Sequence, residues 1–271
     1  ELVKEEGLPD YNFFTHKGFL RYITIRRTRL GQQLISFLTS SMDNSESLER
    51  IATTLINENL TNTVQWQLAA AKGDSSFGTP YRFWGQEFIE EKIFDYRFKL
   101  SANTFFQANL EVAEKAYSEI RDHVKASKAQ NVLDLYSGTC TIGICLSDCV
   151  GNLTAVENFT PNRDMAFKNF ETNKITNINY IDKDMAEFFE TYEATPDYVV
   201  CNPPRAGVDE KPLRKLMKLK PQSISYLSCN PKTLLEDLAI MTLHYKIDSA
   251  KILDMFPQTK HFETLVQLSL K

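Results

Sequence analysis

The sequence predicts an α/β protein in which a small mixed α+β domain precedes a larger domain built on a parallel, doubly wound sheet. From residue 107 onward, short apolar runs alternate five times with helical stretches, as the crossovers of a parallel sheet require. The first hundred residues instead show hairpin signals and alternating polar and apolar positions, which are typical of antiparallel strands. We therefore expect two domains, at residues 1–100 and 101–271.

Length and composition suit a protein with two hydrophobic cores. The chain has 271 residues, of which 42% are hydrophobic and 24% charged. Its net charge of −4 gives no general attraction for nucleic acid, so RNA binding would need a local basic patch. No run of 18 apolar residues occurs, so we expect no membrane partner. We also expect a monomer and, because the chain begins with Glu1 rather than Met, a piece of a longer protein.

The cysteines argue against a metal site and against a disulfide framework. Their number is odd and none forms a C-x-x-C pair, so we expect no metal within this chain. A reducing, cytoplasmic compartment is the corresponding expectation. The cysteines are Cys140, Cys145, Cys149, Cys201 and Cys229.

The first domain is expected to be mainly antiparallel. Two β-branched and aromatic runs within residues 19–41 flank a turn at Gly31, which predicts a β-hairpin. An amphipathic helix is expected to start at Asn44. Residues 64–68 and 94–100 alternate in polarity and are predicted to be strands.

The second domain is expected to place its functional residues where its strands end. In a doubly wound sheet, binding sites lie at the carboxyl ends of the parallel strands. The last two runs, 246–256 and 261–270, have no helix between them, so they predict an antiparallel pair that closes the sheet edge. The five parallel strands are predicted at residues 131–136, 153–157, 178–181, 197–201 and 224–228.

The loop after the first parallel strand indicates which cofactor the sheet suits. It runs from Gly138 to Gly143 with the spacing of a dinucleotide fingerprint, but Cys140 stands where the second glycine would be. That glycine lets the backbone approach a pyrophosphate, so a dinucleotide is disfavoured. Glu157 ends the next strand, where a carboxylate can bind both hydroxyls of a ribose. Together they favour S-adenosylmethionine, and the alternative is a generic tight turn beside a surface acid.

The fourth strand is followed by Asn202-Pro203-Pro204-Arg205 at the same predicted rim. Two prolines fix an extended turn, which would hold the Asn202 side chain in a constant orientation toward a cleft. The alternative interpretation is a rigid connector in which the asparagine is only a turn residue.

Cys229 ends the fifth strand, and Asn230-Pro231 follows at the N-cap and first turn of a helix. A thiol just before a helix N-terminus lies in the positive field of the helix dipole, so we expect the thiolate form to be favoured. The other four cysteines lack this setting. We expect Cys140, Cys145 and Cys149 to belong to a helix packed on the sheet, and Cys201 to end a buried strand.

Glu263 lies just inside the last apolar run, where a carboxylate is costly unless it has a partner or a function. Taken alone, Glu263 could be a surface acid on an edge strand, and His261 a structural histidine. Acid–base chemistry becomes attractive only when Glu263 is considered together with Cys229.

Four strings carry a resemblance to a known family: D-L-Y-S-G, N-P-P-R-A-G, L-S-C-N-P-K-T-L and D-M-F-P-Q-T-K-H-F-E. In this order and spacing they resemble the RNA uracil-5-methyltransferases that use S-adenosylmethionine, most strongly over residues 92–271. The resemblance implies a Rossmann-like class I methyltransferase sheet. It also implies methylation of C5 of a uridine in RNA, foremost in 23S ribosomal RNA, with uridine 54 of transfer RNA as the alternative.

The resemblance also implies roles for individual residues. Cys229 would be the nucleophile that adds to uracil C6, and Glu263 the base that removes the C5 proton. Positions matching the cofactor site of the family are Gln107, Tyr136, Gly138, Thr141, Glu157, Asp184 and Asn202. Positions assigned to the substrate are Asn202, Arg205, Gln107 and His261.

The sequence departs from the family at two points. The family usually has Asp where this chain has Asn202, whose amide can donate to O4 and accept from N3–H of uracil. Neither the amino-terminal RNA-binding barrel nor the clustered cysteines of an iron–sulfur site that some members carry is present in these residues. RNA contacts would then fall to basic residues, which are equally consistent with a solvated face. These are Arg21, Arg26, Arg27 and Arg29 in the first hairpin and the run from Lys211 to Lys220.

Three other functions compete with this prediction. An N6-adenine or other amino methyltransferase suits Asn202-Pro203-Pro204 but needs no thiol. A cytosine-5-methyltransferase shares the thiolate route, but RNA cytosine enzymes usually carry a cysteine after the proline, where this chain has Arg205. A module that binds cofactor or RNA without catalysis is the third.

Overall fold

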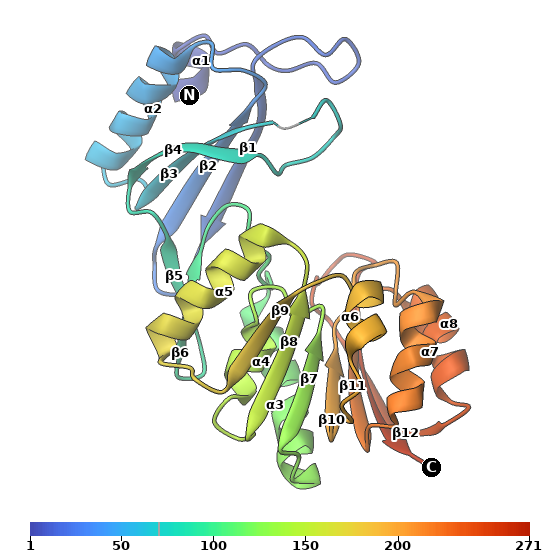
Figure 1. Cartoon of the computed structure of the whole chain (residues 1–271). Helices are drawn as coiled ribbons and strands as arrows, with labels where there is room; N and C mark the ends of the chain where they lie inside the picture. Colours follow the sequence, from blue (N-terminus) through green and yellow to red (C-terminus); the bar gives the residue numbers. More distant parts are fainter. Residues whose placement is uncertain (70) are drawn as a thin grey trace. The chain divides into compact units, whose positions relative to one another are not determined.

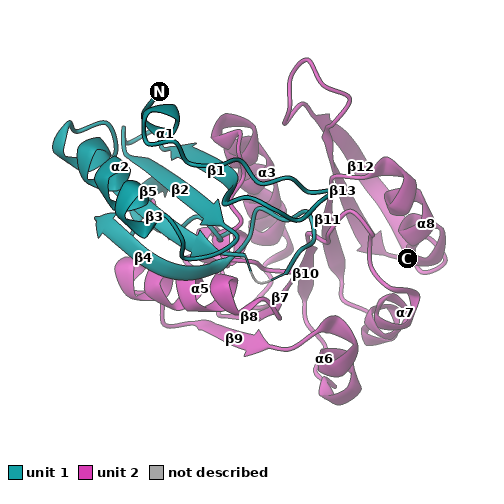
Figure 2. Ribbon diagram, turned by 90° about the horizontal axis from the view of Figure 1, so that it is seen from above, with its two compact units in different colours: residues 1–92, 97–104 teal, residues 93–96, 105–271 magenta. Residues whose placement is uncertain are grey.

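The computed structural model describes residues 1–69 and 71–271. It divides into two compact units, coloured separately in Figure 2. Unit 1 comprises residues 1–92 and 97–104, and unit 2 comprises residues 93–96 and 105–271. The boundary predicted at residue 100 lies in the stretch where the chain passes between the units.

Unit 1 is a four-stranded sheet with one long helix. Its strand order is β1-β2-β3-β4, and all neighbours are antiparallel except β2 and β3. The predicted hairpin is confirmed, because β1 and β2 pair antiparallel around a turn at which Gly31 has φ of +80°. The elements are α1 (Leu2–Glu5), β1 (Leu20–Arg27), β2 (Gln33–Thr39), α2 (Ser45–Asn57), β3 (Thr63–Leu68) and β4 (Thr79–Gly85). A separate two-stranded sheet is formed by β5 (Ile89–Ile93) and β6 (Tyr96–Leu100).

Helix α2 covers this sheet because its apolar residues recur every three or four positions. Leu48, Ile51, Ala52 and Leu55 are buried and belong to one cluster with residues of β2 and β3, among them Trp66. The predicted helix is thereby confirmed to within a residue at its start.

Two of the four hairpin arginines are used within unit 1. Arg21 is buried, donates a 2.6 Å hydrogen bond to the carbonyl of Ala71, and packs over the rings of Tyr11 and Phe13. Arg29 forms an ion pair with Glu91. The prediction that Arg21 contacts RNA is therefore wrong, since its guanidinium is used within unit 1.

Unit 2 is a seven-stranded sheet with the order β12-β13-β11-β10-β7-β8-β9 (Figure 1). The strands β7 to β11 are parallel, and each predicted strand is found to within two residues. They are β7 (Asn131–Leu135), β8 (Asn152–Glu157), β9 (Ile178–Asp182), β10 (Tyr198–Cys201) and β11 (Ser223–Ser228). The helices are α3 (Leu110–Ser127), α4 (Thr141–Leu146), α5 (Thr160–Asn173), α6 (Met185–Thr191), α7 (Glu210–Leu219) and α8 (Pro231–Met241).

The strand order reverses between β7 and β10. The chain proceeds from β7 outward to β8 and β9, then returns to β10 on the other side of β7 and continues to β11. The loops that follow β7 and β10 diverge to opposite sides, so a crevice opens between the carboxyl ends of these two strands. Apolar residues of α6, α7 and α8 pack in one cluster with the strands and support this part of the sheet.

The last two strands, β12 (Tyr245–Leu253) and β13 (Glu263–Leu270), form the predicted antiparallel pair. Strand β13 lies between β12 and β11 and is antiparallel to both. It therefore begins at the edge where the parallel strands end, which places its first residue, Glu263, at that edge.

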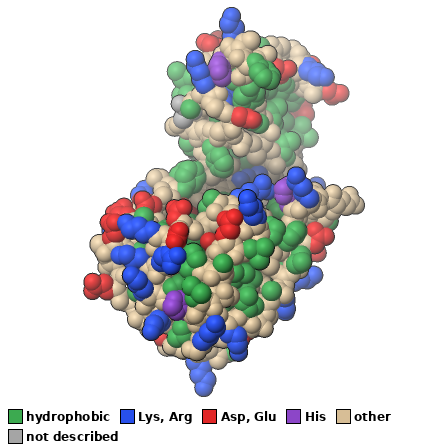
Figure 3. Space-filling view, turned by 90° about the vertical axis from the view of Figure 1, so that its right-hand side faces the viewer, with side chains coloured by type: hydrophobic (Ala, Val, Ile, Leu, Met, Phe, Trp, Pro, Cys, Tyr) green, Lys and Arg blue, Asp and Glu red, His purple; other side chains and the backbone are tan. Residues whose placement is uncertain are grey.

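The basic residues of α7 lie on a solvated helix face. Lys211 pairs with Glu190 at 3.3 Å and Arg214 with Glu210 at 2.7 Å. On the face drawn in Figure 3, acidic and basic side chains lie next to one another. Within the described residues, no helix is long and apolar enough to cross a membrane.

Candidate active site

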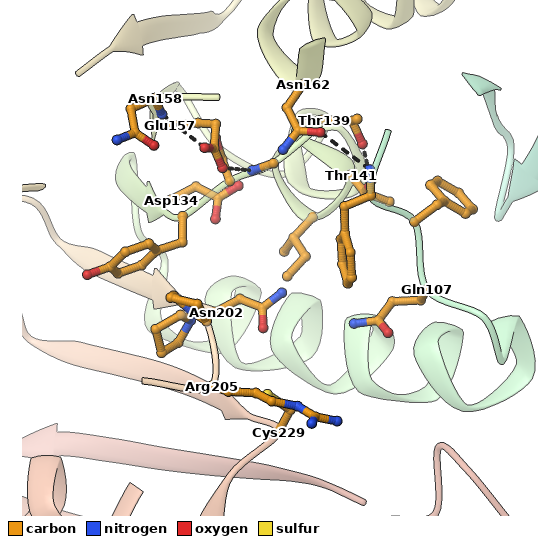
Figure 4. Close-up of a pocket in the computed structure, with 18 of the residues that line it drawn as sticks. Gln107, Asp134, Thr139, Thr141, Glu157, Asn158, Asn162, Asn202, Arg205 and Cys229 are labelled. Atoms are coloured by element: carbon orange, nitrogen blue, oxygen red, sulfur yellow. Dashed lines mark hydrogen bonds between the residues drawn. The ribbon is translucent and has the colours of Figure 1, made fainter. Parts of the chain in front are cut away.

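A cavity of about 920 Å³ lies where β7, β8, β10 and β11 end (Figure 4). A volume of this order holds a molecule the size of a nucleoside cofactor. Eleven residues were predicted for the site, and ten of them line this cavity: Gln107, Tyr136, Gly138, Thr141, Glu157, Asp184, Asn202, Arg205, Cys229 and Glu263. His261 is partly buried outside the lining, and its backbone amide donates to Thr259 Oγ1. A substrate contact of His261 stays a prediction.

The glycine loop takes left-handed backbone at three alternate positions. The φ angles of Tyr136, Gly138 and Cys140 are +58°, +56° and +57°. Cys140 thus adopts, at some strain, the conformation for which glycine is preferred. Its sulfur is buried, and a Cβ atom on Gly143 would lie 2.5 Å from it. Gly143 is therefore needed for the loop to close around Cys140.

The cysteines near this loop lie differently from the prediction. Helix α4 is short, so Cys140 precedes it and Cys149 follows it, while only Cys145 lies within it. Cys201 ends the buried strand β10, as expected.

The carboxylate of Glu157 is held by backbone amides. Its Oε2 accepts from the amide of Gly138 at 3.0 Å, and its Oε1 accepts from the amides of Asn158 and Phe159, both at 2.9 Å. These bonds join the glycine loop to the end of β8 and fix the acid at the cavity edge. Asp184 is also anchored, because its Oδ1 accepts from the amide of Glu187 at 2.8 Å and caps α6.

The Asn202–Arg205 loop is fastened to the start of α8. The carbonyl of Arg205 accepts from Asn230 Nδ2 at 2.8 Å and from Thr233 Oγ1 at 3.3 Å. Further along, the amide of Val208 donates to the carboxylate of Asp237 at 3.0 Å. The loop that carries Asn202 is therefore hydrogen-bonded to the helix that follows Cys229. These bonds support the fixed orientation predicted for the Asn202 side chain.

The register of two strands brings Cys229 and Glu263 together. Ser228 of β11 pairs with Thr264 of the antiparallel β13. One step further along each strand, Cys229 stands opposite Glu263. A nucleophilic thiol and a carboxylate therefore face each other across the end of this ladder, and both line the cavity.

Burial controls the protonation of this pair. The pKa of Cys229 is raised by burial and by the charge of Glu263, and the nearby guanidinium of Arg205 acts in the opposite direction. Burial raises the pKa of Glu263 to about 7, although Arg205 lowers it. Its Oε2 has no hydrogen-bond partner among the described residues. The prediction that the helix terminus favours the thiolate is wrong, because burial and a neighbouring acid raise the pKa of Cys229.

Asp134 of β7 also lines the cavity and was missed by the sequence analysis. Its side chain is 1% exposed, and burial raises its pKa to about 7. The signal was available, because Asp134 is the only charged residue in the apolar run N-V-L-D-L-Y. Residues 1–69 and 71–271 contain no group of three or more His, Cys, Asp or Glu side chains that could hold a metal ion.

Comparison with known proteins agrees with this geometry. Residues 83–271 match the model of the tRNA (uracil-5-)-methyltransferase family. An uncharacterised RNA methyltransferase of Clostridium acetobutylicum is 33% identical over 100% of this chain and 60% of its own length. The tRNA (uracil(54)-C(5))-methyltransferase of Pyrococcus horikoshii is 32% identical over 99% of this chain and 62% of its own length.

A solved structure shares the fold. The Pyrococcus abyssi tRNA (uracil-54, C5)-methyltransferase, in complex with S-adenosyl-L-homocysteine, superposes with a TM-score of 0.84 at 29% identity. The match covers 98% of this chain and 64% of that one. The chain spans about three fifths of the length of the curated relatives it matches. The sheet is therefore a class I methyltransferase fold, and the chain belongs to the tRNA (uracil-5-)-methyltransferase family.

Proposed function

We propose that this chain is the catalytic part of an S-adenosylmethionine-dependent enzyme that methylates C5 of a uridine in RNA. The observation that carries the proposal is the β11–β13 register, which sets Cys229 opposite Glu263 in the cavity beside the glycine loop. Amino methyl transfer, the principal rival, gives neither side chain a function. Family membership supports the same choice.

The cavity suits the cofactor at both of its ends. Glu157 is fixed at the end of β8, where a carboxylate binds ribose hydroxyls in this sheet type. Deeper in the cavity, Asp134 offers an unpartnered carboxylate to a positively charged group. When bound, S-adenosylmethionine supplies an electrophilic methyl group. Gln107, Tyr136, Thr141 and Asp184 complete the proposed cofactor contacts.

The chemistry assigned to the protein begins at Cys229. Its thiolate adds to uracil C6, and the electron pair of the C5–C6 double bond moves toward O4, which makes C5 nucleophilic. C5 takes the methyl group as the bond between methyl and sulfur breaks. Glu263 then removes the C5 proton, the C5–C6 double bond re-forms, and the bond from C6 to Cys229 breaks. Atoms and electrons balance without an external oxidant or reductant.

Asn202 is proposed to read the uracil ring. The amide can donate to O4, where charge builds during addition, and accept from N3–H. Asn202 follows β10 and is held by buried Pro203, so its orientation is set before substrate arrives. Replacing it by alanine should lower turnover and the preference for uracil together. Unchanged turnover and preference in Asn202→Ala would remove Asn202 from this role.

RNA containing 5-fluorouridine tests the covalent route. Fluorine at C5 cannot leave as a proton, so the adduct with Cys229 should accumulate in the presence of S-adenosylmethionine and survive denaturing electrophoresis. Cys229→Ala should give no adduct, and Cys149→Ala serves as the matched control at another partly buried thiol. Methyl transfer that persists in Cys229→Ala would favour an amino methyltransferase instead.

We propose 23S ribosomal RNA as the target, with uridine 54 of transfer RNA as the second candidate. The choice of ribosomal RNA rests on the resemblance of the sequence strings, whereas the relative with a named target, at 32% identity, is a transfer RNA enzyme and supports the second candidate. In either case the base must leave its stack to reach Cys229, which suits loops and single strands. Mass-spectrometric mapping of 5-methyluridine in a strain lacking the full-length protein distinguishes the two targets.

A further inference from the structure

Asp237 of α8 is a buried acid whose hydrogen bonds join three parts of unit 2. It is 5% exposed and does not belong to the cavity lining. Its Oδ2 accepts from the hydroxyl of Tyr226 in β11 and, at 3.0 Å, from the amide of Val208. Val208 lies three residues after Arg205, in the loop that follows β10. One carboxylate oxygen therefore links α8, β11 and the loop that carries Arg205.

The loop packs so closely against α8 that only glycine fits between them. Gly207 has φ of +79°, a left-handed conformation that favours glycine. A Cβ atom on Gly207 would lie 3.0 Å from Oδ2 of Asp237 and 3.0 Å from Cβ of Thr233. On the other side of Gly207, the carbonyl of Arg205 accepts from Asn230 and Thr233. The loop is therefore attached to α8 both before and after Gly207.

The attached loop holds the guanidinium of Arg205 beside Cys229. Both residues line the cavity, and Figure 4 shows the Arg205 side chain next to Cys229. Two charged groups act on the thiol: Glu263 of β13 raises its pKa, and Arg205 lowers it. Tyr226 lies in β11, three residues before Cys229. The strand that leads to the thiol and the loop that carries its cationic neighbour are therefore hydrogen-bonded to the same carboxylate.

We propose that Asp237 is a positioning residue that holds Arg205 against Cys229, and that the Tyr226 hydroxyl keeps the Asp237 carboxylate in the required orientation. The inference rests on the proposed function and extends it to residues outside the cavity. Hydrogen bonds to a carboxylate are shorter and about twice as strong as neutral ones, so they fix a loop tightly. If these bonds are lost, the guanidinium can move away from the thiol. Its attraction for the thiolate then weakens with distance, and less thiolate forms at a given pH.

Alkylation of Cys229 by iodoacetamide over a range of pH tests the proposal without RNA or cofactor. The thiolate is the reacting form, so the midpoint of the rate against pH reports the pKa of Cys229. Peptide mass spectrometry separates its product from that of Cys149, the other partly buried thiol. Tyr226→Phe should move the midpoint to higher pH and lower the rate at pH 8 by about three- to tenfold. Asp237→Asn keeps an oxygen that can accept both hydrogen bonds but loses the charge, so its rate should fall between those of wild type and Asp237→Ala.

A second buried tyrosine supplies the matched control. Tyr245 is as buried as Tyr226, and its hydroxyl donates to the carbonyl of Pro221 at 2.8 Å. Tyr245→Phe should therefore lower Tm, as Tyr226→Phe does, without moving the alkylation midpoint. In Arg205→Gln the guanidinium is already absent, so adding Tyr226→Phe should move the midpoint no further.

Three results would overturn the inference. They are an unchanged midpoint in Tyr226→Phe, an equal shift in Tyr245→Phe, and full additivity of the shifts from Tyr226→Phe and Arg205→Gln. The proposed function is tested separately by the adduct with 5-fluorouridine RNA. A wild type that forms no adduct would overturn the proposed function, whereas the alkylation result would still decide whether Asp237 positions Arg205.

Discussion

Two pairs of acids line the same cavity but differ in their hydrogen bonding and burial. Glu157 and Asp184, which we call the rim acids, accept hydrogen bonds from backbone amides and hold the ends of β8 and α6. Asp134 and Glu263, which we call the buried acids, lie inside strands, have oxygens without partners, and have pKa values raised to about 7 by burial. The rim acids stabilise the local structure through their hydrogen bonds, whereas burial of the other two acids destabilises it.

This difference separates groups that fold the site from groups that act in it. A carboxylate that accepts amide hydrogens repays its desolvation, so the rim acids are consistent with folding alone. A buried acid without partners is retained only if some other process uses its charge or its proton. For Glu263 we propose proton removal, and for Asp134 we propose pairing with a cationic cofactor. Substitutions in the two pairs should therefore change stability with opposite signs.

The largest effect is expected from Glu263→Gln. Without a base at this position, turnover should fall by about 10²–10⁴-fold. Addition and methyl transfer do not need Glu263, so RNA carrying a methylated uracil should remain attached to Cys229. Denaturing electrophoresis followed by mass spectrometry of the peptide detects this adduct. Glu236→Gln, on the exposed face of α8, is the control. Loss of turnover without any adduct would show that Glu263 acts in a step before methyl transfer.

The second prediction concerns the pH dependence of kcat/KM. Glu263 must be unprotonated to accept the C5 proton, so activity should fall as pH drops through about 7 rather than through about 4.5. Because burial raises the pKa of the Cys229 thiol, activity should continue to rise above pH 7 as more thiolate forms. Arg205 lowers the pKa of Glu263 and of Cys229, so Arg205→Gln should move the acid limb to higher pH. The rate of Cys229 alkylation should shift in the same direction. Arg214→Gln, at a surface ion pair, should move neither curve. An acid limb near 4.5 in wild type would show that burial does not control Glu263.

Local patterns were sufficient to predict the elements that carry the site. Five alternating strands and helices fixed the doubly wound sheet, and parallel strands must end at one edge. The residues placed after those strands, such as Tyr136, Asn202 and Cys229, therefore had to meet at the same cavity. It was enough to know which residue directly follows each strand in the sequence.

Properties that depend on several distant segments were not predictable. The pairing of Cys229 with Glu263 requires the register between β11 and β13, which the sequence does not specify by itself. The pKa of Cys229 was expected to fall because only the helix dipole is local, whereas burial and Glu263 raise it through tertiary structure. Arg21 was taken for a surface residue for the same reason, because its aromatic and carbonyl partners become known only in the fold.

A rim substitution should destabilise the protein. Glu157→Ala leaves three backbone amides to find water, which should lower the free energy of unfolding by about 1–3 kcal/mol. For unit 2 this corresponds to a fall in Tm of roughly 2–4 °C per kcal/mol. Glu171→Ala, at an exposed position on α5, should leave Tm nearly unchanged. Differential scanning calorimetry of the protein without cofactor makes the measurement. An unchanged Tm in Glu157→Ala would remove the distinction between the rim and the buried acids.

The smallest effect is expected from Asp134→Asn, and its sign is opposite. The folded pKa of about 7 lies above the unfolded value of about 4, so folding costs free energy increasingly as pH rises through this interval. Removing the charge should raise Tm by about 2–4 °C at pH 8, after allowance for the unpartnered amide that replaces it.

At pH 5 the same substitution should have about a third of its effect at pH 8, because Asp134 is then mostly protonated in the folded state. Asp164→Asn, at an exposed acid, controls for the change in net charge. At pH 8, saturating S-adenosylmethionine should make the Tm of wild type higher than that of Asp134→Asn. Wild type then gains a counter-ion contact that the variant lacks. Calorimetric scans with and without cofactor measure the sign of the Tm difference between Asp134→Asn and wild type in each state. If Asp134→Asn were less stable than wild type in both scans, Asp134 would act as the rim acids do, in holding the fold.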